Sequence, residues 1–207
     1  MLRVTEAENI YIGWYSSSNQ YSWKSTGNDK AIYDSLCRAN NDVAYNRKVG
    51  YIKMEEGFDN SFDEGNVVGQ CYEKIINIDI ISESDFDAQH PIGTSLSDIV
   101  HFCSTSVSQF IESGYTFKYD WKSATPELFN KEPELFYFQT NRFAYQCTPV
   151  DKLLSEMKTN DFYLLNPGLG FLIFDKQPTL SKTHLLTVSV TLDDGRVLSG
   201  AVTKTFN

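Results

Sequence analysis

The chain has 207 residues, of which 41% are hydrophobic and 14% aromatic, and a formal net charge of −9. This composition buries a substantial core, so a globally disordered chain is excluded. The acidic balance and the scattered basic residues argue against nucleic acid or an anionic membrane surface as the main partner, and favour a cation, a neutral glycan or a protein.

Aromatic and small polar residues near the start predict a pair of strands. Residues 11–15 indicate the first strand, a serine-rich turn follows, and residues 21–24 indicate its partner. A short helix is then predicted, capped by Asp29 and ended before Asn40.

The middle of the chain begins with a clear strand pattern. Residues 72–81 predict a strand with Ile76, Ile78 and Ile80 on one face. The apolar positions between residues 96 and 110 are separated by serines, and they predict a helical turn and a loop.

The segment after residue 130 predicts strands on either side of a helix. Residues 134–146, 162–165 and 171–174 are predicted strands. Thr148 followed by proline is typical of a helix start, so residues 149–158 are predicted to form the clearest helix. The apolar residues of this helix face are Val150, Leu153, Leu154 and Met157.

The last residues predict an antiparallel hairpin, because aliphatic and hydroxyl side chains alternate and then break at Asp193-Asp194-Gly195. The aliphatic set is Leu186, Val188, Val190 and Leu192, and the hydroxyl set is Thr187, Ser189 and Thr191. Asp-Gly suits the positive φ angles of a two-residue turn. The whole chain, residues 1–207, is therefore predicted to be one mainly β domain, an antiparallel β-sandwich of immunoglobulin-like general architecture with one or two short helices.

Several strand and turn patterns carry a family resemblance. Residues 76–80 running into Ser82, Gly93, residues 96–98 and the turn at 192–196 resemble the uncharacterised exported lipoproteins of Bacteroidetes-type Gram-negative bacteria. The resemblance implies a mature domain in the periplasm or at the cell surface, tethered by a lipid on an N-terminal cysteine. No cysteine precedes Cys37, so the anchor of the native precursor is expected to have been removed.

The aromatic opening is the first candidate for a ligand site. Its members are Trp14, Tyr15, Tyr21 and Trp23. Such rings can form a stacking platform for sugars. The competing interpretation is core packing, because strand alternation places Trp14 and Tyr15 on opposite faces.

An acidic segment is the candidate metal site. Asp59, Asp63 and Glu64 offer the hard oxygen ligands that Ca²⁺ prefers. Their spacing is not that of a calcium-binding helix-loop-helix, so a solvated acidic loop is the competing interpretation. We expect no metal or cofactor to be required for folding.

The cysteines and histidines form no recognisable ligand motif. Cys37, Cys71, Cys103 and Cys147 are widely spaced and could form two disulfides or remain buried thiols. His90, His101 and His184 form no ligand pair on one helical face, and each is predicted to be structural or exposed.

The functional prediction depends largely on missing motifs, because the sequence shows no nucleophile motif and no phosphate-binding motif. Residues 93–97 do not form Gly-x-Ser-x-Gly, and residues 168–170 lack a third glycine. The prediction is a non-enzymatic binding or structural protein of a cell envelope, with a protein or glycan ligand and no transmembrane segment. The alternative is a secreted or periplasmic hydrolase that acts on an extracellular polymer such as a glycan.

Overall fold

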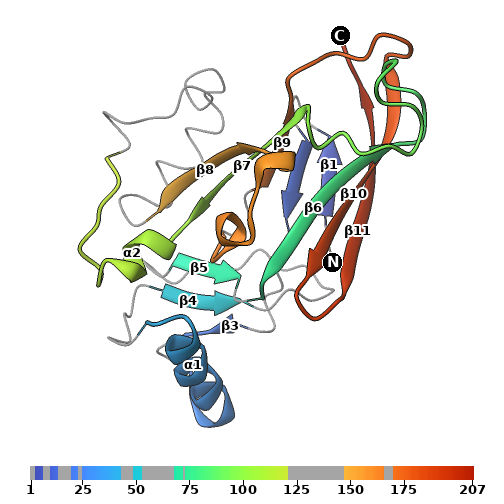
Figure 1. The fold of residues 1–207 in the computed structure, drawn as a ribbon. Coiled ribbons are helices and arrows are strands. Elements are labelled where there is room, and N and C mark those ends of the chain that lie inside the picture. The colour runs from blue at the N-terminus through green and yellow to red at the C-terminus, as the bar shows by residue number, and fades with distance from the viewer. Residues whose placement is uncertain are drawn as a thin grey trace.

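The computed structural model describes residues 3–6, 10–13, 20–22, 25–42, 49–52, 68–71, 73–120, 147–165 and 170–207. These residues form a mainly β protein with two antiparallel sheets and a third, smaller sheet (Figure 1). The predicted mainly β fold with antiparallel sheets is therefore confirmed.

The larger sheet has five antiparallel strands in the order β1, β2, β9, β7, β8. The bounds are Arg3–Glu6 for β1, Ile10–Gly13 for β2, Gly170–Phe174 for β9, Val100–Ser106 for β7 and Thr148–Leu153 for β8. Strand β9 matches the predicted strand at 171–174. The strand β7 replaces the predicted loop, because it pairs with neighbours on both sides.

The second antiparallel sheet has the order β11, β10, β6. The bounds are Ile75–Ser82 for β6, Thr183–Leu192 for β10 and Val197–Thr205 for β11. The predicted hairpin is confirmed, since β10 pairs with β11 along its length. The predicted inward residues Leu186, Val188, Val190 and Leu192 are all 0% exposed.

The hairpin turn differs in detail from the prediction. The N–H of Gly195 donates to the carbonyl of Leu192 at 3.0 Å, and the N–H of Leu192 donates to the carbonyl of Arg196 at 2.9 Å. Gly195 has φ +86°, whereas Asp194 is not among the residues with positive φ. The loop is thus a three-residue turn closed by one left-handed glycine, and the two-residue turn is wrong.

The two antiparallel sheets share one hydrophobic core in a sandwich-like arrangement. Val100, Phe102 and Leu172 of the five-stranded sheet belong to the same buried cluster as Ile80 and Val188 of the three-stranded sheet. At one end of this core, an aromatic group closes the space between the sheets. The ring of Phe86 lies 5.6 Å from Phe174, 5.5 Å from Phe206 and 5.2 Å from His184.

A β-bulge corrects the predicted face of β6. Ile78 and Ile80 are buried as predicted, but Ile76 is 45% exposed and Ile75 is buried. The pairing register of β6 with β10 shifts between Thr191 and Leu192. The extra residue in β6 reverses the alternation below that point.

The predicted helix at 149–158 is wrong. Strand β8 occupies Thr148–Leu153 and a single 3-10 turn, η3, follows at Leu154–Glu156. Strand β8 lies at the edge of the sheet, so Pro149, which has no N–H to donate, is tolerated there. Pairing with β7 outweighs the local helix signal, and the apolar residues Val150, Leu154 and Met157 still reach the core.

The predicted strand at 162–165 is also wrong. The 3-10 turn η4 spans Thr159–Phe162, and Leu165 forms an isolated bridge to Ser106. Leu164 between them has φ +51°, which interrupts any extended strand. The predicted strand at 134–146 lies outside the described residues.

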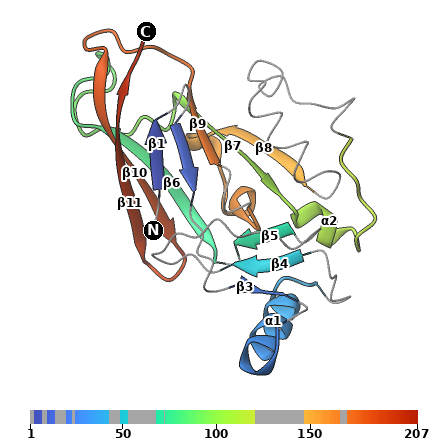
Figure 2. The same ribbon diagram turned by 180° about the vertical axis from the view of Figure 1, so that it is seen from behind.

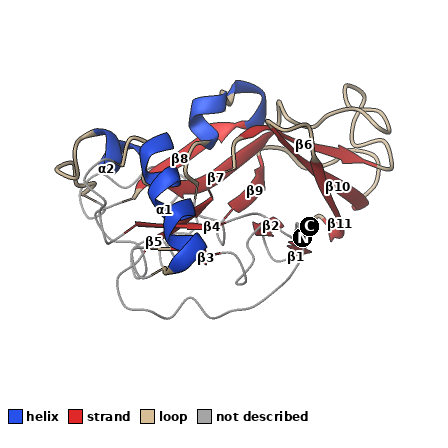
Figure 3. Ribbon diagram, turned by 90° about the horizontal axis from the view of Figure 1, so that it is seen from below, coloured by secondary structure: helices blue, strands red, loops and turns tan. Residues whose placement is uncertain are grey.

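The first helix is confirmed, although it begins earlier than predicted. Helix α1 spans Gly27–Ala39 with Thr26 at its N-cap, and α2 spans Ser108–Glu112. Helix α1 lies beside the small sheet (Figures 1 and 3). That sheet contains β3 (Gln20–Tyr21), β4 (Val49–Ile52) and β5 (Val68–Cys71). Strand β3 pairs with β4, so the predicted pairing of residues 21–24 with 11–15 is wrong.

Helix α1 and the C-terminus lie at opposite ends of the molecule (Figure 2). A second buried cluster forms at the helical end. Its members are Tyr33, Cys37, Val107, Ile111, Cys147 and Leu164. Among the described residues, no helix has the length and apolar character that crossing a bilayer demands.

Candidate functional site

The outward side of the sheet formed by β11, β10 and β6 is the candidate ligand surface. Strand alternation places hydroxyl side chains opposite the buried aliphatic row, where they are exposed or half-buried. We call this surface the hydroxyl face. Its members are Thr183, Thr187, Ser189 and Thr191 of β10 and Ser199, Thr203 and Thr205 of β11.

The hydroxyl face is continuous across the sheet. Ser189 lies between Ser199 of β11 and Asp79 of β6, so a polar row crosses all three strands. The hydroxyls of Thr183 and Thr205 are 3.2 Å apart and share a hydrogen bond. At about 3.4 Å per residue, the nine residues of β11 give the face a length of about 30 Å.

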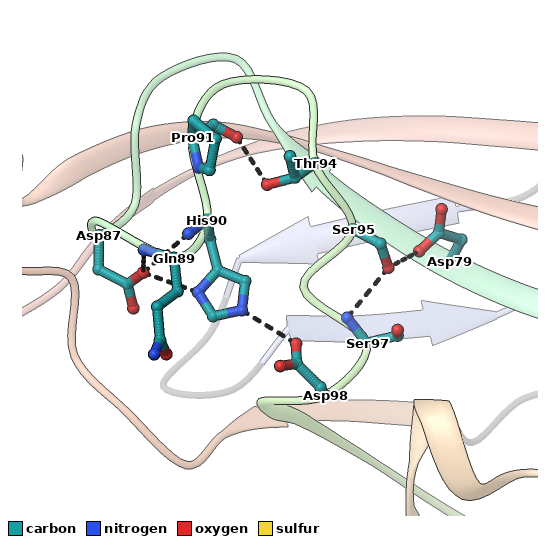
Figure 4. A network of polar contacts seen from close by, with 9 residues as sticks. All are labelled: Asp79, Asp87, Gln89, His90, Pro91, Thr94, Ser95, Ser97 and Asp98. Atoms are coloured by element: carbon teal, nitrogen blue, oxygen red, sulfur yellow. Dashed lines mark hydrogen bonds and ion pairs between the residues drawn. The ribbon is translucent and has the colours of Figure 1, made fainter.

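Asp79 is the only ionisable side chain at the outward positions of β6, β10 and β11. Its Oδ1 accepts a hydrogen bond from the Ser95 hydroxyl at 2.6 Å (Figure 4). The same oxygen accepts a hydrogen bond from the N–H of Ile80 at 2.9 Å. Because Ser95 also bridges Ile81, the segment around it extends the sheet beyond β6. The face is therefore weakly charged, and its hydroxyls can each donate and accept hydrogen bonds.

His90 organises the loop that borders this face (Figure 4). Its Nδ1 lies 2.8 Å from Oδ1 of Asp87, and its Nε2 lies 3.0 Å from Oδ1 of Asp98. The ring is only 5% exposed. Burial alone would lower the pKa of His90, but the bonds to the two carboxylates outweigh it and raise the pKa above its usual value.

His101 forms a second bridge between carboxylates. Its Nδ1 lies 3.0 Å from Asp151 of β8, and its Nε2 lies 3.2 Å from Asp175, just after β9. The Cys103 thiol donates to the same Asp151 carboxylate at 3.7 Å. This group ties together three strands on the outer side of the five-stranded sheet.

His184 of β10 forms a third polar contact group. Its Nδ1 lies 2.8 Å from the hydroxyl of Ser82 and 2.9 Å from that of Ser84. Its Nε2 lies 2.8 Å from the carbonyl oxygen of Ser181, and the residue is 1% exposed. The contact of His184 with the two serines is buried, and its Nε2 faces the main-chain carbonyl oxygen of Ser181.

The three histidines thus join loops and strands. Both nitrogens of each ring lie within 3.2 Å of an oxygen atom. Within the part of the chain that the structure describes, no group of three or more His, Cys, Asp or Glu side chains is arranged to hold a metal ion.

Most of the site residues predicted from sequence lie outside the described residues. These are Trp14, Tyr15 and Trp23 of the aromatic platform and Asp59, Asp63 and Glu64 of the acidic segment. Tyr21 is described, and it is half-buried against the second cluster. The alternation that predicts the hairpin also contains the signal for the hydroxyl face, because it places the hydroxyl set opposite the aliphatic set.

Three of the four cysteines are buried thiols. Cys37, Cys103 and Cys147 are each 0% exposed. Burial raises the pKa of Cys37 to about 11 and that of Cys147 to about 12. Of the alternatives left open by the sequence, the structure shows buried thiols for these three.

Comparisons of the chain with family models, curated proteins and solved structures gave no significant match. The fold and the side-chain geometry therefore provide the basis for a functional proposal.

Proposed function

We propose that the protein is a non-enzymatic binding protein of a cell envelope and that it binds a neutral glycan along the hydroxyl face. The sequence resemblance to exported lipoproteins supports a position in the periplasm or at the cell surface, with a lipid anchor in the native precursor. The observation that carries the binding proposal is the continuous array of outward hydroxyls on β10 and β11.

The chemistry of the hydroxyl face matches a sugar polymer. Ser and Thr hydroxyls donate and accept hydrogen bonds, as sugar hydroxyls do. Leu185 is 40% exposed and Val197 is 56% exposed, and both provide apolar contact for the faces of sugar rings. The lack of basic residues at the outward positions and the net charge of −9 disfavour an anionic polymer.

The supporting layer gives the hydroxyl face a fixed shape. Every second residue of β10 from Leu186 to Leu192 is fully buried, and β10 is paired on both sides. A surface that is already ordered loses little conformational entropy when it binds. An ordered, weakly charged surface about 30 Å long suits an extended chain.

A double variant, Thr187→Val with Thr203→Val, tests the proposal. Valine keeps the shape and strand preference of threonine but removes the hydroxyl. We expect the affinity for a glycan selected on an array to fall about 30-fold, because two hydrogen bonds of about 1 kcal/mol each are lost. Isothermal titration of the full chain measures this loss.

The matched control is Thr179→Val, an exposed threonine in the loop before β10. This variant should bind as the wild type does. Equal affinities for the double variant and the wild type would refute the hydroxyl face as the binding surface. Incubating the bound glycan and measuring reducing ends separates the binding protein from the alternative hydrolase, because a binding protein leaves its ligand intact.

A further inference from the structure

We propose that the Asp87–His90–Asp98 bridge is a pH-sensitive latch. With its proton in place, His90 bridges Asp87 and Asp98 and so closes the loop of residues 83–99 just before the start of β7, and on losing that proton it releases Asp98. This inference concerns the order of the loop and is independent of the ligand proposed for the hydroxyl face.

The latch follows from the hydrogen-bonding capacity of imidazole. A neutral ring has one N–H donor and one acceptor, whereas the imidazolium has two donors. Both nitrogens of His90 face carboxylate oxygens, at 2.8 Å and 3.0 Å, and a carboxylate can only accept. The geometry therefore fits the imidazolium, and the neutral ring leaves a lone pair opposite a carboxylate.

The charged groups around the ring are few and identified. Asp87 and Asp98 contact it from its own loop, while Asp85 accepts a hydrogen bond from the N–H of Ile92 at 2.7 Å. His184 of β10 is separated from His90 by the ring of Phe86, which contacts both. The segment after β9 bonds to the loop through Thr179, and its Asp175 is paired with His101.

The carboxylate that leaves is Asp98. The Asp87 carboxylate is 15% exposed, and its Oδ1 also accepts the N–H groups of Gln89 at 2.8 Å and His90 at 2.9 Å. The Asp98 side chain is 62% exposed. The neutral ring therefore keeps its proton on Nδ1 toward Asp87, and Asp98 turns to water, where its charge is readily solvated.

Release of Asp98 acts on a junction between elements. The carbonyl of the preceding Ser97 accepts the N–H of Ser155 at the start of η3 at 2.9 Å. The N–H of the following Ile99 donates to Leu96 at 3.1 Å, and its carbonyl accepts the N–H of Asp175 at 2.9 Å. The amides of Ser155 and Ile99 are thus reporters of the latch.

The direction of the switch follows from the raised pKa of His90. The latch is closed below the ordinary histidine value of about 6.5 and opens as the pH rises through the raised value. Mildly acidic conditions order the loop, and alkaline conditions loosen it.

The test combines a histidine titration by NMR with amide hydrogen exchange of the full chain. In the wild type, we expect His90 to titrate above about 6.5. The exchange of the Ser155 and Ile99 amides, corrected for its intrinsic pH dependence, should rise about tenfold across that titration. The latch would be overturned if His90 titrated at or below the ordinary histidine pKa. It would also be overturned if the exchange rates of the Ser155 and Ile99 amides did not change across the titration.

Three variants separate the latch from a general effect of charge. Asp98→Asn keeps a hydrogen bond in both states, because a carboxamide can accept from the imidazolium and donate to the neutral ring; the pH response should vanish. Asp98→Ala should loosen the reporters at every pH. Asp193→Asn, an exposed aspartate in the hairpin turn, should behave as the wild type, and an equal effect of this control would contradict the proposal.

Discussion

Individual polar residues in the buried parts of this protein are held by specific partners. Asp42 is 0% exposed, and the Cys37 thiol donates to its Oδ2 at 3.7 Å. The Tyr163 hydroxyl donates to Oδ1 of Asn40 at 2.5 Å, just after α1. These contacts lower the cost of burying polar groups and fix the end of the helix.

The buried thiols give a prediction at this scale. Cys147 is fully buried, and burial raises the pKa of its thiol to about 12, so the reactive thiolate is scarce at pH 8. We expect Cys37, Cys103 and Cys147 to resist alkylation in the native protein and to react at once in denaturant. Mass spectrometry of peptides after timed labelling measures each cysteine separately.

Denaturant supplies the internal control, because it exposes the same three side chains without changing the sequence. Rapid labelling of Cys147 in the native protein would contradict the buried position of this residue, which directly precedes β8. Labelling of Cys37 alone would instead show local opening around α1.

The secondary-structure elements show which signals in the sequence were decisive. The hairpin of β10 and β11 was predictable because alternation and turn residues agree over adjacent segments. Strands β7 and β8 were not, because their extended form depends on pairing with each other and, for β7, with β9, which is distant in sequence. Local propensity favours a helix after Thr148, and tertiary pairing outweighs it.

The hairpin turn gives a prediction at the scale of elements. Gly195 has φ +86°, and a Cβ added there meets no atom within 4 Å. Gly195→Ala should therefore lower the free energy of unfolding by about 1–2 kcal/mol through backbone strain alone. Urea denaturation followed by circular dichroism measures the change.

Gly195→Asn is the matched comparison, since asparagine adopts left-handed backbone more readily than alanine. We expect it to cost about half as much as the alanine variant. Equal losses for the two variants would point to a steric clash, and no loss in either would contradict the left-handed conformation at this position.

For the molecule as a whole, function was less predictable than architecture. The sequence predicted a mainly β sheet protein, since the buried and exposed sides of β10 are encoded in the alternation itself. The continuity of the hydroxyl face depends on the register that places Ser189 between Ser199 and Asp79. Likewise, the bridge from Asp87 through His90 to Asp98 depends on how the loop closes, which no spacing rule specifies.

The pH dependence of stability gives a prediction for the whole molecule. The raised pKa of His90 means that its stabilising contribution is complete below about 6.5 and is lost as the pH rises through the raised value. Three carboxyls behave in the opposite way. For Asp87 and Asp161, burial would raise the pKa, but hydrogen bonds to His90 and Lys152 outweigh it; for Asp194, bonds from Arg196 lower it.

The contribution of these carboxyls is complete above about 3.9 and is lost as the pH falls through their lowered values. We therefore expect the urea midpoint to be highest between about pH 4 and 6.5, and to decline on both sides. His90→Gln should flatten the alkaline decline, while the acid decline persists through Asp161 and Asp194, whose bonding partners are elsewhere. An alkaline decline that survives unchanged in this variant would show that another group, and not the bridge at His90, controls stability above neutral pH.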